Sequence, residues 1–351
     1  MPKSHRLPAG KRLALMRVVA IGGGTGLATL LRGLKPHVRP PAGHAPRPPA
    51  VSRLTAIVTV TDEGGSSGRL RRDFGMLPPG DIRNCLVALA EDEQLLTRLF
   101  TYRFSGSGSL AGHSFGNLFL AALTHLTGDF AKAVRLSSEV LAVRGEIFPS
   151  TLSDVHLKAR LADGRTLHGE APINQTSVPI RRLDLVPRGA RALPDALAAI
   201  DEADLITLGP GSLYTSLIPN LLVRGIATHI ACARARKVFI ANLMTQPGET
   251  RDHTASDHLR AIQEHARGRR LFDCVVLSNQ SISPAMQKRY AAEGAAPVLN
   301  DLDEVRRLGV TPIITPLLEK GRVARHAPGR LARLVLRLGR EGKPDSATLS
   351  S

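Results

Sequence analysis

Two adjacent acids, Asp62 and Glu63, begin the segment of this sequence most able to do chemistry. They follow an apolar run and precede Gly-Gly-Ser-Ser-Gly, a group of arginines at 69–72 and a Pro-Pro-Gly turn before Asp81. Carboxylate oxygens are the ligands that Mg²⁺ prefers, and guanidinium groups bind phosphoryl oxygens. The segment predicts a metal-bridged phosphate with Asp62, Glu63 and Asp81 as metal ligands. Asp81 is also placed to cap a helix that starts there, and both readings stay open.

A glycine-rich turn at 22–26, "GGGTG", directly follows a short apolar run. Glycines let backbone N–H groups approach an anion at the start of the next helix, where the helix dipole also favours negative charge. The turn matches neither the Walker pattern nor the G-x-G-x-x-G dinucleotide pattern, because no Lys-Ser/Thr follows and Leu27 stands where the third glycine belongs. It predicts an anion site, with a tight structural turn as the alternative.

Two further loops carry polar groups behind apolar runs. "LGPGS" offers Gly209, Gly211 and the hydroxyl of Ser212, while "NLMTQPGET" offers the amides of Asn242 and Gln246. Amides and hydroxyls can recognise a base or a sugar edge. Because a pyrophosphate needs donors from more than one side, two glycine loops together favour a nucleotide or phosphosugar ligand.

The segment "AGHSFGNL" places His113, Ser114 and Asn117 beside a predicted helix start. A Ser/His pair without an assigned acid, and without G-x-S-x-G, does not indicate a serine hydrolase. His113 is therefore interpreted as a ligand contact or a core residue.

These loops must be positioned by a sheet. Apolar runs at 17–21 and 54–60 and within "ADLITL", "KVFIAN" and "DCVVLSN" read as buried strands, and helical spacing follows the first of them at Leu27, Leu30, Leu31 and Leu34. Such alternation predicts an α/β fold with a Rossmann-like, mostly parallel sheet flanked by helices. Ligands of such sheets bind at the carboxyl ends of the strands, so the loops at 22–26, 62–69, 209–212 and 242–248 should share one rim.

A β-hairpin excursion is predicted around Asp163-Gly164, where "LKARLADGRTLHGE" alternates. The remaining organisation is simple. Residues 1–16 read as a basic N-terminal tail with Met16 as an alternative start, 17–330 as one nucleotide-binding domain interrupted by a Pro-rich loop at 36–50, and 331–351 as a basic, polar C-terminal tail.

Composition limits the class of protein. The 351 residues are 43% hydrophobic, enough for a large core, and no apolar run reaches the ~20 residues that span a bilayer. The net charge of +17 could attract nucleic acid, but 3% aromatic residues and no Trp argue against a single-strand platform, so nucleic acid is not expected as a partner. Cys85, Cys232 and Cys274 read as reduced core thiols, which favours the cytoplasm.

Five motifs in order, "AIGGGTGL", "TVTDEGGSSGRLRRDFGMLPPGDIRN", "LAGHSFGNL", "LGPGSLYTSLIPNLLV" and "NLMTQPGETRDHTASDHL", make the chain resemble the bacterial gluconeogenesis factor family of the 2-phospho-L-lactate transferase superfamily. The resemblance covers residues 17–330. It implies a Rossmann-like fold, a cytoplasmic location, binding of UDP-sugars such as UDP-N-acetylglucosamine, and a role in cell shape and morphogenesis during gluconeogenic growth. A homo-oligomer and regulators of cell-wall synthesis are the implied protein partners.

Together, the motifs and the resemblance assign a set of nucleotide-binding residues: Gly23, Gly24, Thr25, Gly26, Ser66, Ser67, Arg69, Asn117, Gly209, Gly211, Ser212, Asn242, Gln246, His253 and Arg289. Two positions depart from the family pattern. Glu63 stands where Asp is more frequent, and His253 stands where Tyr is frequent, which weakens an argument for an aromatic ring stacked on uracil.

Three functions compete. The leading one is a UDP-sugar-binding regulator, because the resemblance implies ligand binding more firmly than turnover. The second is a Mg²⁺-dependent transferase of the 2-phospho-L-lactate transferase type, with catalytic candidates Asp62, Glu63 and Asp81. The third is an NAD-binding oxidoreductase, because Asp62 ends the second predicted strand, where a ribose-binding acid would lie.

Overall fold

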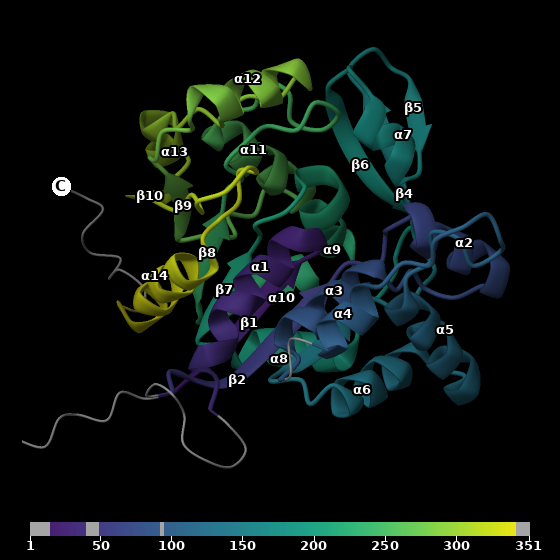
Figure 1. Ribbon diagram of the computed structural model, residues 1–351. Coiled ribbons are helices and arrows are strands. Elements are labelled where there is room, and N and C mark those ends of the chain that lie inside the picture. The colour runs from purple at the N-terminus through teal and green to yellow at the C-terminus, as the bar shows by residue number, and fades with distance from the viewer. Residues whose placement is uncertain (1–14, 40–48, 92–94, 342–351) are drawn as a thin grey trace, which may run out of the picture.

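The structure is a computed structural model that describes residues 15–39, 49–91 and 95–341. Its centre is a seven-stranded parallel sheet in the order β10-β9-β8-β7-β1-β2-β3, which confirms the predicted fold class (Figure 1). The strands are β1 (Met16–Gly22), β2 (Val51–Val58), β3 (Glu146–Pro149), β7 (Leu205–Leu208), β8 (Arg236–Ile240), β9 (Cys274–Ser278) and β10 (Thr311–Thr315).

The central strands are buried on both faces, as expected of a parallel sheet covered by helices. Val19 of β1 pairs with Thr55 of β2 on one side and with Ile206 of β7 on the other. Ile21, Ile57 and Leu208 are fully buried. These apolar runs bury β1 between β2 and β7 in the core.

The direction in which successive strands are added to the sheet reverses at β1. The chain runs outward through β2 and β3, and returns to β7 on the opposite side of β1 before continuing to β8, β9 and β10. Right-handed crossovers in opposite directions place their helices on opposite faces of the sheet. Accordingly α1 (Gly24–Leu34), α3 (Gly80–Leu89) and α14 (Pro328–Glu341) pack together on one face, while α8 (Pro194–Glu202), α9 (Ile218–Leu222) and α10 (Ile226–Cys232) form a second contiguous group (Figure 1).

The other helical segments lie around these layers. They are α2 (Gly65–Phe74), α4 (Leu95–Thr101), α5 (Phe115–Thr127), α6 (Phe130–Val140), α7 (Glu170–Gln175), α11 (Ala255–His265), α12 (Pro284–Ala292), α13 (Leu302–Arg307), the short 3₁₀ helix η1 (Lys35–His37) and the π-helix η2 (Leu213–Leu217).

The predicted hairpin excursion is confirmed. Strands β4 (His156–Leu161) and β5 (Thr166–His168) pair antiparallel, and β6 (Ile180–Val186) completes a separate sheet in the order β5-β4-β6. Alternating burial along β4 places Leu157, Ala159 and Leu161 in the core.

Three expectations about single segments are wrong. Residues 331–341 are not a polar tail, because Leu331, Val335 and their apolar neighbours pack α14 against α1, β7 and β8. Met16 is buried at the start of β1 rather than in a tail. Cys232 is exposed at the end of α10, whereas Cys85 and Cys274 are buried as expected. Residues 1–14, 342–351 and most of the Pro-rich loop lie outside the described residues.

Among the described residues, no helix is both long enough and apolar enough to cross a membrane.

Candidate functional site

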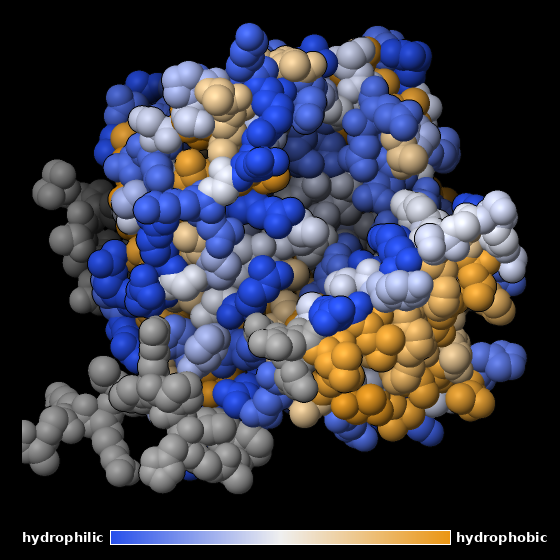
Figure 2. Space-filling model, in the orientation of Figure 1, coloured by the Kyte–Doolittle hydropathy of each residue, from blue (hydrophilic) through white to orange (hydrophobic). Residues whose placement is uncertain are grey.

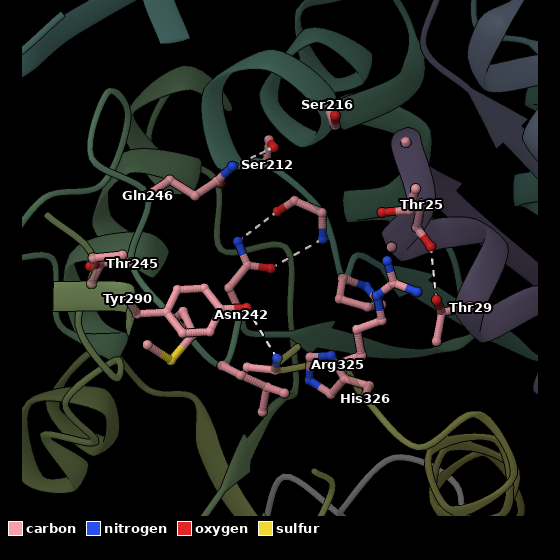
Figure 3. A pocket seen from close by; sticks show the side chains of 18 of the residues that line it. Thr25, Thr29, Ser212, Ser216, Asn242, Thr245, Gln246, Tyr290, Arg325 and His326 are labelled. Atoms are coloured by element: carbon pink, nitrogen blue, oxygen red, sulfur yellow. Dashed lines mark hydrogen bonds between the residues drawn. The ribbon is translucent and has the colours of Figure 1, made fainter. Parts of the chain in front are cut away.

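A pocket of about 370 Å³, lined by both polar and apolar residues, lies where the strand order reverses, at the carboxyl ends of β1, β7 and β8 (Figure 3). This is the place where open α/β sheets bind ligands, and the volume is typical of small-molecule sites. Three of the four predicted rim loops line the pocket, with residues 23–26, 210–212 and 242–247. The fourth loop, at 62–69, does not line the pocket. Its Asp62 belongs to a neighbouring group of acidic side chains.

The first wall is the start of α1. Gly24 has φ of +62°, a left-handed conformation that glycine adopts without strain. The first N–H groups of a helix have no partner within it, and the N-cap residue Gly23 has no side chain to supply one. The backbone of Gly24 interacts with the carboxylate of Asp81 and partly offsets the effect of burial on the pKa of Asp81. The amides of Thr25 and Gly26, which line the pocket, come next in this turn.

The second wall is the loop after β7, which touches α1 directly. A Cβ added to Gly26 would lie 2.3 Å from the carbonyl oxygen of Pro210, so only glycine permits this contact. The side chain of Asn242 holds the same loop. Its Oδ1 accepts from the N–H of Gly211 at 3.2 Å and its Nδ2 donates to the Gly211 carbonyl at 2.9 Å. Asn242 therefore positions the glycine loop with both ends of its amide.

Gln246 lies on the same wall. Its Nε2 donates to the hydroxyl of Ser212 at 2.8 Å, while its Oε1 is buried without a hydrogen-bond partner. Unpaired buried acceptors are costly in proteins. The Gln246 oxygen, in a residue that lines the pocket, is therefore suited to accept an N–H from a ligand.

The third wall comes from two later segments: one holds Tyr290, next to the predicted Arg289, and the other, at 324–326, was not singled out from the sequence. Tyr290, Arg325 and His326 line the pocket, and the Tyr290 hydroxyl accepts from the N–H of Ala324 at 3.0 Å. Figure 3 shows the Arg325 side chain extending toward Thr25 and Thr29 on α1. Burial lowers the pKa of His326 to about 4, so its ring is neutral at pH 7. Arg325 thus supplies a cation facing the glycine turn.

A buried group of acids adjoins the first wall. Asp81 is held at the start of α1, and a Cβ added to Gly23 would lie 2.5 Å from its Oδ2. Burial, and then the charge of Asp62, raise the pKa of Asp81 to about 7. The same two causes, burial first, raise the pKa of Glu170 to about 8. We call these three neighbouring residues, Asp62, Asp81 and Glu170, the acid group. No sequence motif indicated Glu170.

Glu63 does not belong to this group, which corrects the predicted metal-ligand set of Asp62, Glu63 and Asp81. Its carboxylate contacts His156 Nδ1 at 2.6 Å and Arg71 at 3.6 Å, and accepts from the N–H of Glu170. Across 15–39, 49–91 and 95–341, no three His, Cys, Asp or Glu side chains are arranged to hold a metal ion. The residues present therefore do not fit a three-acid metal site.

The alternative reading of Asp81 as a helix cap is also wrong. Helix α3 begins at Gly80 with Pro79 as its N-cap residue, and no side chain caps it. Asp81 lies inside the first turn, and its carboxylate reaches across to α1 instead.

Ser66, Ser67 and Asn117 meet in a buried cluster outside the pocket. The Nδ2 of Asn117 donates to the hydroxyls of Ser66 at 3.1 Å and Ser67 at 3.4 Å, and Ser66 contacts His113 Nδ1 at 3.0 Å. Arg83 donates to Asn117 Oδ1 at 3.0 Å from the other side. These contacts join α2, α3 and α5, and a ligand role for the three residues stays a prediction.

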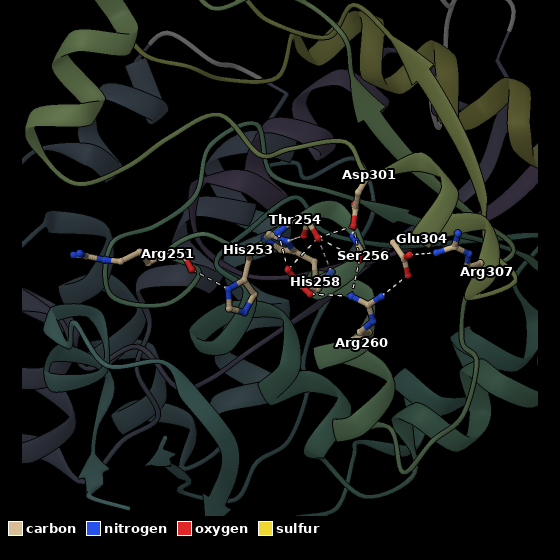
Figure 4. Close-up of polar contacts among 10 residues, drawn as sticks. Arg251, His253, Thr254, Ser256, His258, Arg260, Asp301, Glu304 and Arg307 are labelled. Carbon is tan, nitrogen blue, oxygen red and sulfur yellow. Dashed lines mark hydrogen bonds and ion pairs between the residues drawn. The ribbon is translucent and has the colours of Figure 1, made fainter. Parts of the chain in front are cut away.

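Arg69, His253 and Arg289 also lie outside the pocket lining. Arg69 donates to the carbonyl of Ala111 at 2.6 Å, and Arg289 lies over the ring of Tyr290 at 5.9 Å. His253 packs edge-on against the rings of Tyr214 and His258. Figure 4 shows it beside the network in which Asp301 accepts from Thr254 and Ser256 and so joins the starts of α11 and α13. A ligand-binding role for Arg69, His253 and Arg289 stays a prediction.

The fold and its pocket define the class: a Rossmann-like α/β protein with glycine turns and one cationic side chain at the switch point of its sheet. Residues 18–318 match the family model described as 2-phospho-L-lactate transferase CofD. The chain belongs to this family, in the branch of the gluconeogenesis factors.

The matches to known proteins extend over most of the chain. The "Gluconeogenesis factor" of Halalkalibacterium halodurans is 45% identical over 94% of this chain and 98% of its own length, and that of Bacillus subtilis is 44% identical over 93% and 98%. A crystal structure of a upf0052 family member from Bacillus halodurans superposes with a TM-score of 0.85 at 44% identity, covering 92% of this chain and 99% of that one.

Proposed function

We propose that this protein binds a UDP-sugar such as UDP-N-acetylglucosamine in the pocket, and that it regulates cell shape in the cytoplasm during gluconeogenic growth. The observation that carries the proposal is the meeting of the α1 glycine turn and Arg325 across one polar pocket. The relatives named gluconeogenesis factor support the metabolic part of the proposal.

The two sides of the pocket suit a diphosphate. The amides at the start of α1 offer N–H groups and the positive end of the helix dipole, which favour phosphate oxygens. Arg325 offers charge-assisted hydrogen bonds from the opposite wall. A diphosphate between them would take donors from two directions.

The rest of the pocket suits a base or an N-acetylated sugar. Gln246 Oε1 is a buried acceptor, and both uracil and an acetamido group carry an N–H that could donate to it. Satisfying that acceptor would remove the cost of an unpaired buried group, about 1–3 kcal/mol. The neighbouring Tyr290 ring and Met244 add apolar surface.

Asp62 does not favour the NAD-binding alternative. An acid that binds the ribose of NAD would have to reach the pocket, but the Asp62 Oδ1 accepts from the N–H of Gly64 at 2.9 Å. The Asp62 Oδ2 lies 2.2 Å from where a Cβ of Gly80 would stand, at the start of α3. NAD is therefore expected to bind more weakly than a UDP-sugar.

A thermal-melting screen against UDP-N-acetylglucosamine, GDP, NAD and uridine tests the proposal. Ligands that bind only the folded state raise its stability by about 2.7 kcal/mol at a hundredfold excess over Kd. The UDP-sugar should give the largest rise in melting temperature, and Arg325→Gln should reduce this rise while Arg322→Gln, an exposed neighbour, should keep it. A larger rise in melting temperature with NAD than with the UDP-sugar, at equal concentration, would contradict the proposed preference for a UDP-sugar.

A transferase remains the second candidate because of the acid group. The raised pKa values of Asp81, about 7, and Glu170, about 8, lie near the pH at which general acids and bases work best. Incubating the protein with a nucleotide-diphosphate donor and an alcohol acceptor should give product only if this second function holds. Loss of that product in Glu170→Gln, with nucleotide binding retained, would assign the chemistry to the acid group.

A further inference from the structure

A buried carboxylate holds the π-helix η2, which forms part of the pocket wall. Glu249 is 3% exposed and lies in the same loop as Asn242 and Gln246. One of its oxygens accepts from the N–H groups of Tyr214 at 2.7 Å and Thr215 at 3.2 Å, and the other accepts from the Thr215 hydroxyl at 2.7 Å. Three hydrogen bonds therefore join the first turn of η2 to this loop.

Hydrogen bonds, and not a cation, compensate the burial of Glu249. Burial raises the pKa of Glu249, and the hydrogen bonds from Thr215 and Tyr214 partly oppose this effect. They also give both carboxyl oxygens a partner, as buried polar groups in proteins normally have. Because these contacts do not depend on a paired positive charge, an uncharged side chain of the same shape could make them as well.

Ser216, the residue after Thr215, faces the glycine turn at the start of α1. A Cβ added to Gly24 would meet only one atom within 4 Å, the Ser216 hydroxyl oxygen at 3.7 Å. Ser216 lines the pocket, and Figure 3 shows it at the same end of the pocket as Thr25. Figure 2 shows the surface hollowed beside the start of α1 as Figure 1 draws it. Within the described residues the Ser216 hydroxyl makes no hydrogen bond, so it can donate to a ligand.

The backbone of η2 fixes Ser216 from two sides. The buried Asn220 donates to the Ser216 carbonyl at 2.8 Å and to the Gly22 carbonyl at 3.2 Å, which joins η2 to the end of β1. On the other side, Glu249 holds the two residues that precede Ser216. Insertions of the π type inside helices are frequent at functional sites. A shift of residues 214–215 would move Ser216 relative to the glycine turn.

We propose that Glu249 is a positioning residue, which places the Ser216 hydroxyl to donate to a phosphate bound at the start of α1. This inference rests on the proposed function in taking a diphosphate as the ligand. Glu249 is absent from the pocket lining, so it acts through the backbone of η2 and not by contact with the ligand. The Ser216 hydroxyl adds a donor to the α1 amides and to Arg325.

Calorimetric titration of the full chain with UDP-N-acetylglucosamine, and with pyrophosphate, which has no base or sugar, tests this role. Glu249→Ala should weaken the binding of both ligands about tenfold, and Ser216→Ala should do the same, because each loses a hydrogen bond to a charged group. The double variant should bind no more than about twofold more weakly than Ser216→Ala, since residues that act as one unit are not additive.

Two further variants separate positioning from a general loss of stability. Glu249→Gln should bind within about threefold of wild type, because its carbonyl oxygen can accept from both N–H groups while its amide donates to the Thr215 hydroxyl. The matched control is Asp301→Ala, which also removes three hydrogen bonds, from Thr254 and Ser256, outside the pocket lining. It should lower the melting temperature as Glu249→Ala does, and should leave the affinity unchanged.

The outcomes distinguish this inference from the proposed function. If wild type binds pyrophosphate with the expected dependence on Glu249 and Ser216 but does not bind the UDP-sugar, the proposed function fails and the positioning role stands. Unchanged affinity in Glu249→Ala, additive losses in the double variant, an equal loss in Asp301→Ala, or no binding of either ligand would overturn the inference. If circular dichroism shows Glu249→Ala unfolded, Thr215→Val replaces it. That variant removes one of the three hydrogen bonds and should weaken binding about threefold, and unchanged affinity would likewise overturn the inference.

Discussion

Asn242 holds Gly211 at both ends of its side-chain amide, with Oδ1 3.2 Å from the Gly211 nitrogen and Nδ2 2.9 Å from its carbonyl oxygen. Gly211 in turn lies against α1, next to Pro210, whose carbonyl limits residue 26 to glycine. The shape of the pocket therefore depends on Asn242, whose side-chain amide forms both of these hydrogen bonds with the protein backbone.

Asn242→Ala should lower both stability and affinity. It leaves the N–H and C=O of Gly211 without these partners, which should cost about 1–3 kcal/mol in the free energy of unfolding. The loosened loop should also weaken UDP-N-acetylglucosamine binding about tenfold, measured by calorimetry at a temperature where both proteins are folded. Unchanged affinity in a folded Asn242→Ala variant would contradict the positioning role.

Gly24→Ala should separate a phosphate-binding turn from a structural one. Its φ of +62° makes any side chain strained, by roughly 1–2 kcal/mol. The control Gly65→Ala has φ of +45° with nothing within 4 Å of its added Cβ, so it bears similar strain outside the pocket lining. Only Gly24→Ala should lose ligand binding. Equal affinities of the two variants for the ligand would indicate that the turn at Gly24 has only a structural role.

Arg325→Gln should weaken UDP-sugar binding by about 10-fold to 100-fold, since charge-assisted hydrogen bonds contribute about 1.5–3 kcal/mol. Arg322→Gln removes the same charge from an exposed neighbour and should change affinity little. Titration at low and at high salt checks the mechanism. If both variants weaken binding equally and only at low salt, then general charge attraction, and not contact in the pocket, explains the effect.

The buried acids should make stability fall as the pH rises. The folded protein holds protons on Asp81 up to about pH 7 and on Glu170 up to about pH 8, whereas unfolded carboxyls release them near pH 4. The folded state therefore binds more protons between these values, and the free energy of unfolding declines with rising pH.

The range from pH 7 to 8 best separates this effect, because the pKa values of His258 and His326 are lowered to about 4 from about 6.5 when unfolded, so these histidines change stability mainly below pH 7. Chemical denaturation at several pH values should show that the free energy of unfolding declines with rising pH in wild type, and declines less in Glu170→Gln. A rise in wild-type stability over this range would contradict the assignment of protonated acids.

Much of the fold followed from sequence, because buried strands and glycine turns have local signatures. The apolar runs of β1, β2 and β7 and the turn at Asp163-Gly164 were predicted in place. Helix α14 was missed although Leu331, Leu334, Val335 and Leu338 have helical spacing, because the intervening arginines suggested a tail.

The site was predicted less completely, because some of its members are joined only by tertiary structure. Glu170 meets Glu63 across 107 residues of chain, and it is the first residue of α7, the helix that follows β5 of the small sheet. Arg325 is one arginine among many in a basic sequence, with no motif around it. The side chain of Glu63 could not be oriented from sequence, since its neighbours His156 and Arg71 come from different elements.

We expect the pocket to bind a UDP-sugar through the α1 turn and Arg325, without a metal ion. Calorimetric titration of UDP-N-acetylglucosamine into wild type and Asp62→Asn, with and without Mg²⁺, tests it most directly. We expect saturable one-to-one binding to wild type, affinity within about threefold with or without Mg²⁺, and little change in Asp62→Asn, because Asp62 is not in the pocket lining. Absence of binding, or binding that requires Mg²⁺ and is lost in Asp62→Asn, would contradict it.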